Sequence, residues 1–246
     1  MDLAGRRVLL TGGATGIGRA TVLELARRGA DLAIVDFNRT EGEAAVRDAE
    51  GLGVRAWFLE CDVRDEAAVR GATAAAAEFL GEINTLITAA GILQGAFQQI
   101  DDLETEVFTR VVDVNLLGTF LFCKHAMPLL VASGTGVILC IASGAGIRGP
   151  SSSLAYSASK GGVYGLCYTL ERHAAERGIR LHVVCPGSLD TPLKRQNVRD
   201  GARSRGEDPD SVLSGTKLGD PSGVARILAF MISSDAGYLQ GTVFTR

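Results

Sequence analysis

The stretch Thr11-Gly12-Gly13-Ala14-Thr15-Gly16-Ile17-Gly18 decides the fold, because it joins an apolar run at 8–11 to a helical segment at 16–28. Strand, glycine-rich turn and helix in this order form the first unit of a doubly wound, nucleotide-binding α/β sheet. Glycines at the spacing Gly-x-x-x-Gly-x-Gly arise easily by chance in a chain with 31 glycines, and an ordinary glycine turn is the alternative. The position of the match, at the first strand-to-helix turn, favours phosphate binding.

Each residue of this turn has an expected task. Gly12 allows the chain to turn, Gly16 lets the backbone approach a pyrophosphate, and Gly18 lets helix and strand pack closely. Thr15 and Ile17 belong to the start of the helix, where free N–H groups and the positive end of the helix dipole attract phosphates.

The rest of the chain repeats the alternation of apolar strands and helices. Further strands are expected at 32–36, 54–59, 83–88, 136–141, 180–185 and 242–245. Further helices are expected at about 40–50, 65–80, 103–131, 154–177 and 221–233. This pattern predicts an α/β fold, with a doubly wound, mostly parallel, seven-stranded Rossmann-type sheet and helices on both faces. We expect one domain over 1–246, without linker or repeat.

The segment 188–220 breaks the alternation, because it is polar and has no clean helical period. We expect a mobile substrate loop here, since long loops in compact domains commonly act as lids. Its basic residues are Lys194, Arg195, Arg199, Arg203 and Arg205. They could attract an anionic substrate, but the acidic residues among them favour a solvated loop. Those acidic residues are Asp200, Glu207, Asp208 and Asp210.

Composition excludes several function classes. A net charge of −3 gives no reason to expect a nucleic-acid or anionic-membrane partner. The five cysteines are far apart and lie in mostly apolar surroundings, which predicts reduced thiols and a cytoplasmic protein. We expect no membrane-spanning helix and no signal peptide. The three histidines have no metal-ligand spacing, so no metal is expected.

Residues at the ends of the next strands predict the rest of a dinucleotide site. Asp36 ends the second strand, where a carboxylate accepts from both ribose hydroxyls and repels a 2′-phosphate, which favours NAD over NADP. Arg39 is near enough to reach a 2′-phosphate, so NADP stays open as the less favoured cofactor. We expect Asp62-Val63 at the adenine edge, and the small pair Ala90-Gly91 to leave room for the adenosine.

Tyr156 and Lys160 lie four residues apart in a predicted helix and therefore share one face. A hydride leaves a carbinol carbon only if the hydroxyl proton departs too, so oxidation needs a base and reduction an acid. A phenol with a pKa near 10 needs about 4 kcal/mol to ionise near neutrality. A cation about 4 Å away at an effective dielectric near 20 supplies about that much. We therefore expect Lys160, helped by the positive charge of oxidised nicotinamide, to lower the pKa of Tyr156, while Ser143 binds the substrate oxygen.

Simpler interpretations exist for the same residues. Tyr156 and Lys160 could form a surface pair, and Ser143 could cap the end of a strand. Asn115 could be a polar residue that is hydrogen-bonded within its own helix.

Together these motifs resemble the short-chain dehydrogenase/reductase family over nearly the whole chain. The resemblance rests on the glycine turn, Asp62-Val63, Ala90-Gly91, Asn115, Ser143, Tyr156, Lys160, Pro186-Gly187 and Thr191, in the family's order. It implies a nicotinamide cofactor and hydride transfer to or from a carbonyl. It further implies that Lys160 binds the nicotinamide ribose and that Asn115 holds a water molecule linked to Lys160. Leu189 and Thr191 would orient the nicotinamide carboxamide, and the long helices at 103–131 and 154–177 would build a homotetramer, with a dimer as the alternative.

The chain also departs from the family pattern. Thr88-Ala89-Ala90-Gly91 replaces Asn-Asn-Ala-Gly, and His182 replaces an asparagine. The sequence ends in Phe244-Thr245-Arg246 without the family's typical Val-Asp-Gly-Gly. In many family members that tail packs near the substrate pocket or a subunit interface, so the resemblance does not extend to these two features.

The leading hypothesis is an NAD-dependent oxidoreductase that acts on a secondary alcohol or its ketone, with Tyr156 as general acid and base. An NADPH-dependent ketoreductase and a non-catalytic dinucleotide-binding sensor or scaffold are the alternatives. The substrate pocket should draw on 93–97, 144–148, Leu154 and 188–217, with Arg148 as an anchor for a polar or anionic group.

Overall fold

A computed structural model describes residues 2–245; the outer limits of the expected domain, Met1 and Arg246, lie outside them. The chain folds around one seven-stranded sheet of order β3-β2-β1-β4-β5-β6-β7, in which every neighbouring pair is parallel. The strands are β1 Arg7–Thr11, β2 Asp31–Asp36, β3 Ala56–Glu60, β4 Thr85–Thr88, β5 Val137–Ile141, β6 Arg180–Cys185 and β7 Thr242–Phe244. The predicted doubly wound α/β sheet is confirmed.

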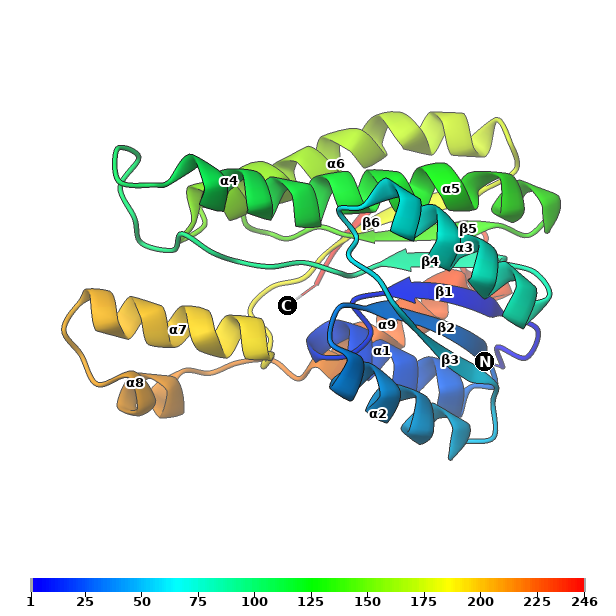
Figure 1. Ribbon diagram of the computed structural model, residues 1–246, viewed down its shortest axis with the longest axis horizontal. Coiled ribbons are helices and arrows are strands. Elements are labelled where there is room, and N and C mark those ends of the chain that lie inside the picture. The colour runs from blue at the N-terminus through cyan, green and yellow to red at the C-terminus, as the bar shows by residue number, and fades with distance from the viewer. Residues whose placement is uncertain (1, 246) are drawn as a thin grey trace.

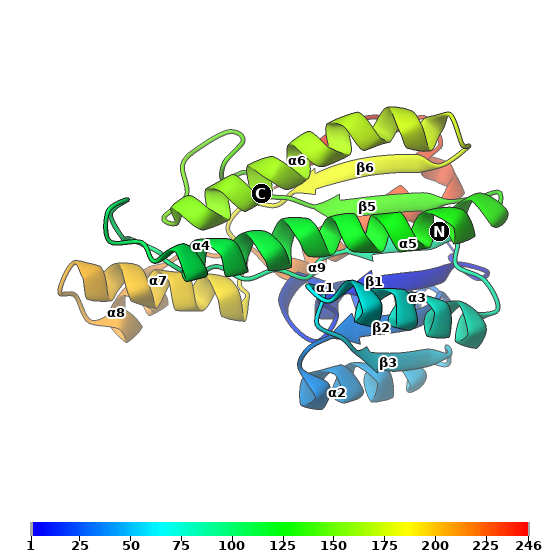
Figure 2. The ribbon, with the colours of Figure 1, turned by 45° about the horizontal axis from the view of Figure 1, so that its top comes forward.

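Helices cover both faces of the sheet (Figures 1 and 2). One face carries α1 Gly16–Arg27, α2 Arg39–Glu50 and α9 Pro221–Ile232. The other carries α3 Glu66–Leu80, α4 Thr105–Val112, α5 Gly118–Ala132 and α6 Leu154–Ala175. Because parallel strands need crossover connections, each strand-to-helix turn opens at the same edge of the sheet, where the strands have their carboxyl ends.

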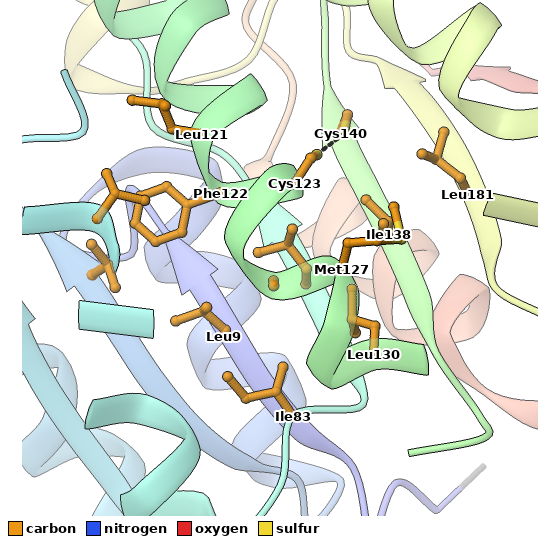
Figure 3. Close-up of a cluster of buried hydrophobic side chains, with 14 of the residues drawn as sticks. Leu9, Ile83, Leu121, Phe122, Cys123, Met127, Leu130, Ile138, Cys140 and Leu181 are labelled. Carbon is orange, nitrogen blue, oxygen red and sulfur yellow. Dashed lines mark hydrogen bonds between the residues drawn. The ribbon is translucent and has the colours of Figure 1, made fainter. Parts of the chain in front are cut away.

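Alternate residues along the strands pack into two separate hydrophobic cores, one on each face of the sheet. In β1, Leu9 faces the core under α3, α5 and α6, whereas Val8 and Leu10 face the core under α1 and α9. Figure 3 shows the first core, in which Phe122 and Met127 of α5 pack over β1 and β5. All these side chains are buried, so the sheet is apolar on both faces and its strands read as continuous apolar runs.

The first core also holds free thiols. All five cysteines are reduced and buried, and the sulfur atoms of Cys123 and Cys140 are 3.9 Å apart (Figure 3).

The segment 188–220 differs from the expected irregular loop, because it contains two helices, α7 Pro192–Ser204 and α8 Pro209–Gly215. Each has a proline in its first turn and a side-chain cap: Thr191 Oγ1 accepts from Lys194 N, and Asp208 Oδ2 accepts from Ser211 N. Capping and proline at the first turn start a helix even where the apolar period is weak. The two helices lie beyond the carboxyl ends of the strands (Figure 1); the mobility of the segment stays a prediction.

Residues Thr105–Ala132 form one long rod, with a π-helical turn, Asp113–Leu117, between α4 and α5. By length and composition this rod is long and apolar enough to cross a membrane, contrary to the expectation from sequence. Half of its most apolar window is buried inside the protein, and a single helix of this kind is weak evidence for a membrane span.

Candidate active site

The predicted site residues meet in one cavity of about 1050 Å³ at the carboxyl ends of the strands. Its walls include Gly12, Thr15, Gly16, Ile17, Gly18, Asp36, Asp62, Val63, Ala90, Gly91, Ser143, Tyr156, Lys160, Pro186, Gly187, Leu189 and Thr191. Of the predicted residues, Asn115 does not line this cavity. The fold thus brings residues from all but the last strand into one site.

The glycine turn packs so closely that side chains cannot be added. Gly12 has a φ of +72°, and a Cβ built on it would lie 2.5 Å from the backbone nitrogen of Ala90. A Cβ on Gly18 would lie 1.9 Å from the carbonyl oxygen of Gly12. Gly18 therefore allows the turn to fold back on its own helix, which keeps the N–H groups of α1 open to the cavity.

The N-terminus of α1 is left without a side-chain cap, because Thr15 makes no capping hydrogen bond. Most other helices are capped by a side chain at the preceding residue. The capping residues are Asn38, Asp65, Ser153, Thr191, Asp208 and Asp220. Open N–H groups at a helix N-terminus suit a phosphate, so the turn fits a dinucleotide.

Asp36 directs a carboxylate into the same cavity from the end of β2. Its Oδ2 accepts from Ala14 N, and its Oδ1 accepts from Asn38 N, both at 3.0 Å. These bonds fix the carboxylate between the glycine turn and the start of α2. Arg39 does not line the cavity, and its guanidinium pairs with Glu60 and Glu43.

Asp62 lines the cavity, but its carboxylate is held by its neighbour. Arg64 donates to it through Nε, at 2.9 and 3.0 Å, and through a terminal nitrogen at 2.6 Å. The hydrogen bonds from the Arg64 side chain hold the pKa of Asp62 below its usual range. Any contact of Asp62 with an adenine therefore competes with Arg64.

Tyr156, Lys160 and Ser143 face the cavity from α6 and from the end of β5. Burial raises the pKa of the Tyr156 phenol, and a hydrogen bond with the Ser143 hydroxyl acts in the opposite direction. Lys160 is buried, and its Nζ donates to Ile141 O at 2.8 Å.

The expected lowering of the Tyr156 pKa by Lys160 is not found. The ammonium lies 5.9 Å from the centre of the phenol ring and faces the carbonyl of Ile141. Burial lowers the pKa of Lys160 itself to about 8. Burial is the largest cause of the Tyr156 shift, and it raises the pKa of the phenol.

Asn115 lies behind the cavity in the π-helical turn and is fully buried. Its amide oxygen accepts from Ile92 N at 2.8 Å, and its amide nitrogen donates to Ile92 O and to Ser159 Oγ, at 3.0 and 2.9 Å. It thus joins the strand-end segment after β4 to the helix of Tyr156 and Lys160. The alternative of a bond confined to its own helix does not hold for its side chain. Its role in water binding stays a prediction.

One departure from the family pattern has a local explanation. Where the family has asparagines after β4, the hydroxyl of Thr11 accepts from Ala90 N at 3.3 Å and bridges the two central strands.

Two residues that were expected in the substrate pocket lie elsewhere. Arg148, expected as a substrate anchor, does not line the cavity, because its guanidinium stacks 3.3 Å from the centre of the Phe244 ring. Leu154 also lies outside the cavity and is exposed.

Several wall residues were not predicted individually. They are Phe37, Arg64, Ile92, Arg110, Val114, Pro150, Ser151, Ser152 and Asn197. Arg110 and Val114 are four apart on the rod that also carries Asn115, so helical spacing could have found them. Ser152 and Asn197 are distant in sequence and meet only in the fold, where Asn197 Nδ2 donates to Ser152 Oγ at 2.7 Å.

Comparisons with known proteins agree with this geometry. A profile of the short chain dehydrogenase family matches residues 6–202. The 3beta-hydroxysteroid dehydrogenase of Mediterraneibacter gnavus is 32% identical, over 96% of this chain and 91% of the relative. The levodione reductase of Leifsonia aquatica is 33% identical, over 97% of this chain and 91% of the relative. The crystal structure of an NAD+-bound xylitol dehydrogenase superposes with a TM-score of 0.91 at 29% identity, covering 99% of this chain and 98% of that one.

Proposed function

Since the chain belongs to the short-chain dehydrogenase/reductase family and is a nicotinamide-dinucleotide-dependent oxidoreductase, we propose that it transfers a hydride between NAD(H) and a secondary alcohol or its ketone. The observation that carries this proposal is the shared cavity. Tyr156, Lys160 and Ser143 open into the same space as the glycine turn and Asp36. A cofactor on the turn and a carbonyl beside the phenol would therefore be neighbours.

The bound nicotinamide would supply or accept the hydride. In reduction, the Tyr156 hydroxyl gives its proton to the carbonyl oxygen; in oxidation, the phenolate takes the proton of the alcohol. Ser143 donates a hydrogen bond to the same substrate oxygen. Lys160 binds the nicotinamide ribose, and its positive charge stabilises the phenolate while the proton is away.

The raised pKa of Tyr156 favours the acid role at neutral pH, because the phenol then carries its proton. Asn115 links the strand end to Ser159 on the helix of Tyr156 and Lys160, and we assign it the task of holding the water that exchanges protons with Lys160.

NAD is the proposed cofactor. The fixed carboxylate of Asp36 would repel a 2′-phosphate, and the nearest expected phosphate ligand, Arg39, is paired with two glutamates outside the cavity. The similarity to a xylitol dehydrogenase described as NAD+-bound supports the same choice. Around the cofactor, we place Asp62-Val63 near the adenine, Ala90-Gly91 near the adenosine, and Pro186-Gly187 with Leu189 and Thr191 near the carboxamide.

Binding of NADH and NADPH, followed by fluorescence, tests the cofactor choice in the wild type and in Asp36→Ala. We expect NADH to bind at least about tenfold more tightly, with the preference lost in Asp36→Ala. Asp101→Ala, which removes an exposed carboxylate outside the cavity, is the control. A preference for NADPH would instead support an NADPH-dependent ketoreductase. Tight binding without turnover of any alcohol or ketone would support a non-catalytic sensor or scaffold.

We also propose a cytoplasmic homotetramer, with a dimer as the alternative. Large apolar side chains are exposed on the long helices that cover one face of the sheet: Phe108, Leu117, Phe120 and Tyr168. Such faces favour association. The five reduced cysteines agree with a reducing compartment. A monomeric mass in light scattering would refute the oligomer.

A further inference from the structure

The basic residues of α7 and the turn that follows it are not equivalent. Four arginines are paired with carboxylates of the same segment. The pairs are Arg195 with Asp190, Arg199 with Asp210, Arg203 with Asp200, and Arg205 with Glu207. These four arginines agree with the expectation of a solvated segment, because none lines the cavity.

Lys194 is different. It is half-buried, it lines the cavity, and within residues 2–245 no carboxylate lies within ion-pair distance of its ammonium. Its closest polar side-chain partner is the amide oxygen of Asn197, at 3.5 Å. A partly buried cation without a counter-charge is costly, unless a ligand supplies the negative charge.

The position of Lys194 is fixed between the glycine turn and the segment that leads into α6. Thr191, which caps the same turn of α7, contacts the position of a Cβ on Gly16, so the helix begins against the glycine turn. One turn later, the buried Asn197 donates to Ser152, in the segment that leads into the helix of Tyr156. Its amide oxygen is thereby turned toward the Lys194 ammonium. Lys194 lies between these two attachment points.

The cavity contains no carboxylate that could neutralise this charge. Its acidic wall residues are Asp36 and Asp62, which accept from backbone N–H groups and from Arg64, respectively. Both belong to the cofactor end. Lys160 and Arg110 are further basic residues in the cavity walls.

A buried acceptor lies in the same wall. The side-chain oxygen of Gln94 is buried and has no hydrogen-bond partner, although Gln94 lines the cavity. The backbone carbonyl of Gln94 accepts from Ser153 Oγ at 2.6 Å, which fixes the segment in place. A buried acceptor without a partner suits a ligand hydroxyl.

We infer that Lys194 binds a carboxylate of the substrate and that Gln94 accepts a hydrogen bond from a substrate hydroxyl. The substrate class is therefore a hydroxylated carboxylic acid whose secondary alcohol or ketone reaches Tyr156. This inference rests on the proposed function for the assignment of the reacting group. At the subsite formed by Lys194 and Gln94, the ammonium and the neutral acceptor match a monoanion better than a phosphate dianion, which requires more donors.

Calorimetry on the NADH-saturated protein tests the anion subsite without turnover. The probes are cyclohexanecarboxylate, its neutral isostere cyclohexanecarboxamide, and cyclohexylphosphonate. We expect the carboxylate to bind roughly 10- to 100-fold more tightly than the carboxamide, as for a charge-assisted hydrogen bond. Lys194→Met should abolish this preference. Arg195→Met, which changes the adjacent residue that is paired outside the cavity, should keep it.

Other outcomes overturn the inference. Equal binding of carboxylate and carboxamide in the wild type, or an unchanged preference in Lys194→Met, removes the carboxylate subsite. Tighter binding of the phosphonate than of the carboxylate would indicate that the subsite binds a phosphate in place of a carboxylate. A loss of NADH affinity in Lys194→Met equal to the loss for the carboxylate assigns Lys194 to the cofactor.

For Gln94, the probe is 3,4-dihydroxycyclohexanecarboxylate, which should bind more tightly than cyclohexanecarboxylate. Gln94→Leu should remove this difference in affinity, and a retained difference contradicts the hydroxyl contact.

Turnover separates this inference from the proposed function. With NADH, 4-oxocyclohexanecarboxylate should be reduced with a kcat/KM roughly 10- to 100-fold above that of 4-oxocyclohexanecarboxamide, and Lys194→Met should remove the difference. Equal reduction of both ketones overturns the carboxylate subsite and leaves the proposed function in place. If neither ketone is reduced while the carboxylate still binds through Lys194, the proposed function fails and the subsite stands.

Discussion

The two ends of the cavity are built differently. At the cofactor end, the contacts come from the backbone: a glycine turn that tolerates no Cβ, the uncapped start of α1, and one carboxylate held by two N–H groups. At the substrate end, they come from side chains on separate segments, such as Ser152 and Asn197. Backbone contacts can be replaced only by moving the chain, whereas side chains change by substitution. We therefore expect substitutions at the cofactor end to cause an abrupt loss of cofactor binding. Substitutions at the substrate end should change substrate binding in graded steps.

The largest effect is expected at Gly18. A Cβ at this position would lie 1.9 Å from the carbonyl oxygen of Gly12, so Gly18→Ala must displace the turn. A displacement of about 1 Å at a binding site can cost about 100-fold, and we expect at least this loss of NADH affinity by fluorescence titration. Gly71→Ala is the matched control, because Gly71 is exposed in α3 and has open space around its Cβ. NADH affinity within a factor of two of the wild type in Gly18→Ala would contradict the account.

Lys160→Met should lower the activity of the protein and raise its stability. We expect kcat for ketone reduction to fall about 100-fold or more, because the charge beside the phenol is lost. Burial lowers the pKa of Lys160 from 10.5 to about 8, which corresponds to about 3 kcal/mol of unfavourable burial at neutral pH.

The stability change follows from two opposing effects. The loss of the hydrogen bond to Ile141 offsets part of the gain, so we expect a net stabilisation of about 1–2 kcal/mol in urea unfolding of Lys160→Met. Lys217→Met, at an exposed lysine outside the cavity, should change neither property. Destabilisation by Lys160→Met would show that the buried charge is well compensated.

The pH dependence should follow the same two residues. Below about pH 8, Lys160 is charged and the Tyr156 phenol, with its raised pKa, is protonated, so kcat/KM for ketone reduction should be level. Above that pH, it should fall by up to about tenfold per pH unit, because Lys160 loses the charge that stabilises the phenolate. Reduction that rises with pH would contradict the acid role of Tyr156.

Stability should move in the opposite direction to reduction. Between about pH 8 and 10.5, the unfolded chain keeps the Lys160 proton that the folded protein has released, so the free energy of unfolding contributed by this group rises with pH. Lys160→Met should lose this rise, as measured by urea unfolding at several pH values.

The smallest effect is expected at Thr11. Its hydroxyl accepts from Ala90 N at 3.3 Å, so Thr11→Val leaves a part-buried N–H without its partner. We expect a loss of about 1 kcal/mol in unfolding free energy and a NADH affinity within a factor of three of the wild type. An unchanged stability would show that this bond does not brace the two central strands.

The cofactor end could be predicted from the sequence, because its signals are local. The glycine turn, Asp36, and the pair Tyr156 and Lys160 are each defined within a few neighbouring residues, and all of them line the cavity. The substrate end could be predicted only in part, because Asn197 and Ser152 are 45 residues apart in sequence.

Three of the expectations that failed have clear physical reasons. Helix α7 could not be recognised from the hydrophobic pattern of the sequence, because a side-chain cap and a proline, rather than an apolar period, define its start. Arg148 was misplaced because its aromatic partner, Phe244, comes from the far end of the chain. The direction of the Tyr156 pKa shift is set by burial, which is not visible in the spacing of Tyr156 and Lys160.

Tyr156→Phe tests the central claim most directly, by NADH binding and ketone reduction measured on the same preparation. The variant removes only the hydroxyl, so we predict NADH affinity within a factor of two of the wild type and a fall in kcat of about 10²–10⁴. Tyr168→Phe, at an exposed position on the same helix, should leave both unchanged. Retention of wild-type turnover by Tyr156→Phe would contradict the assignment of Tyr156 as the acid and base.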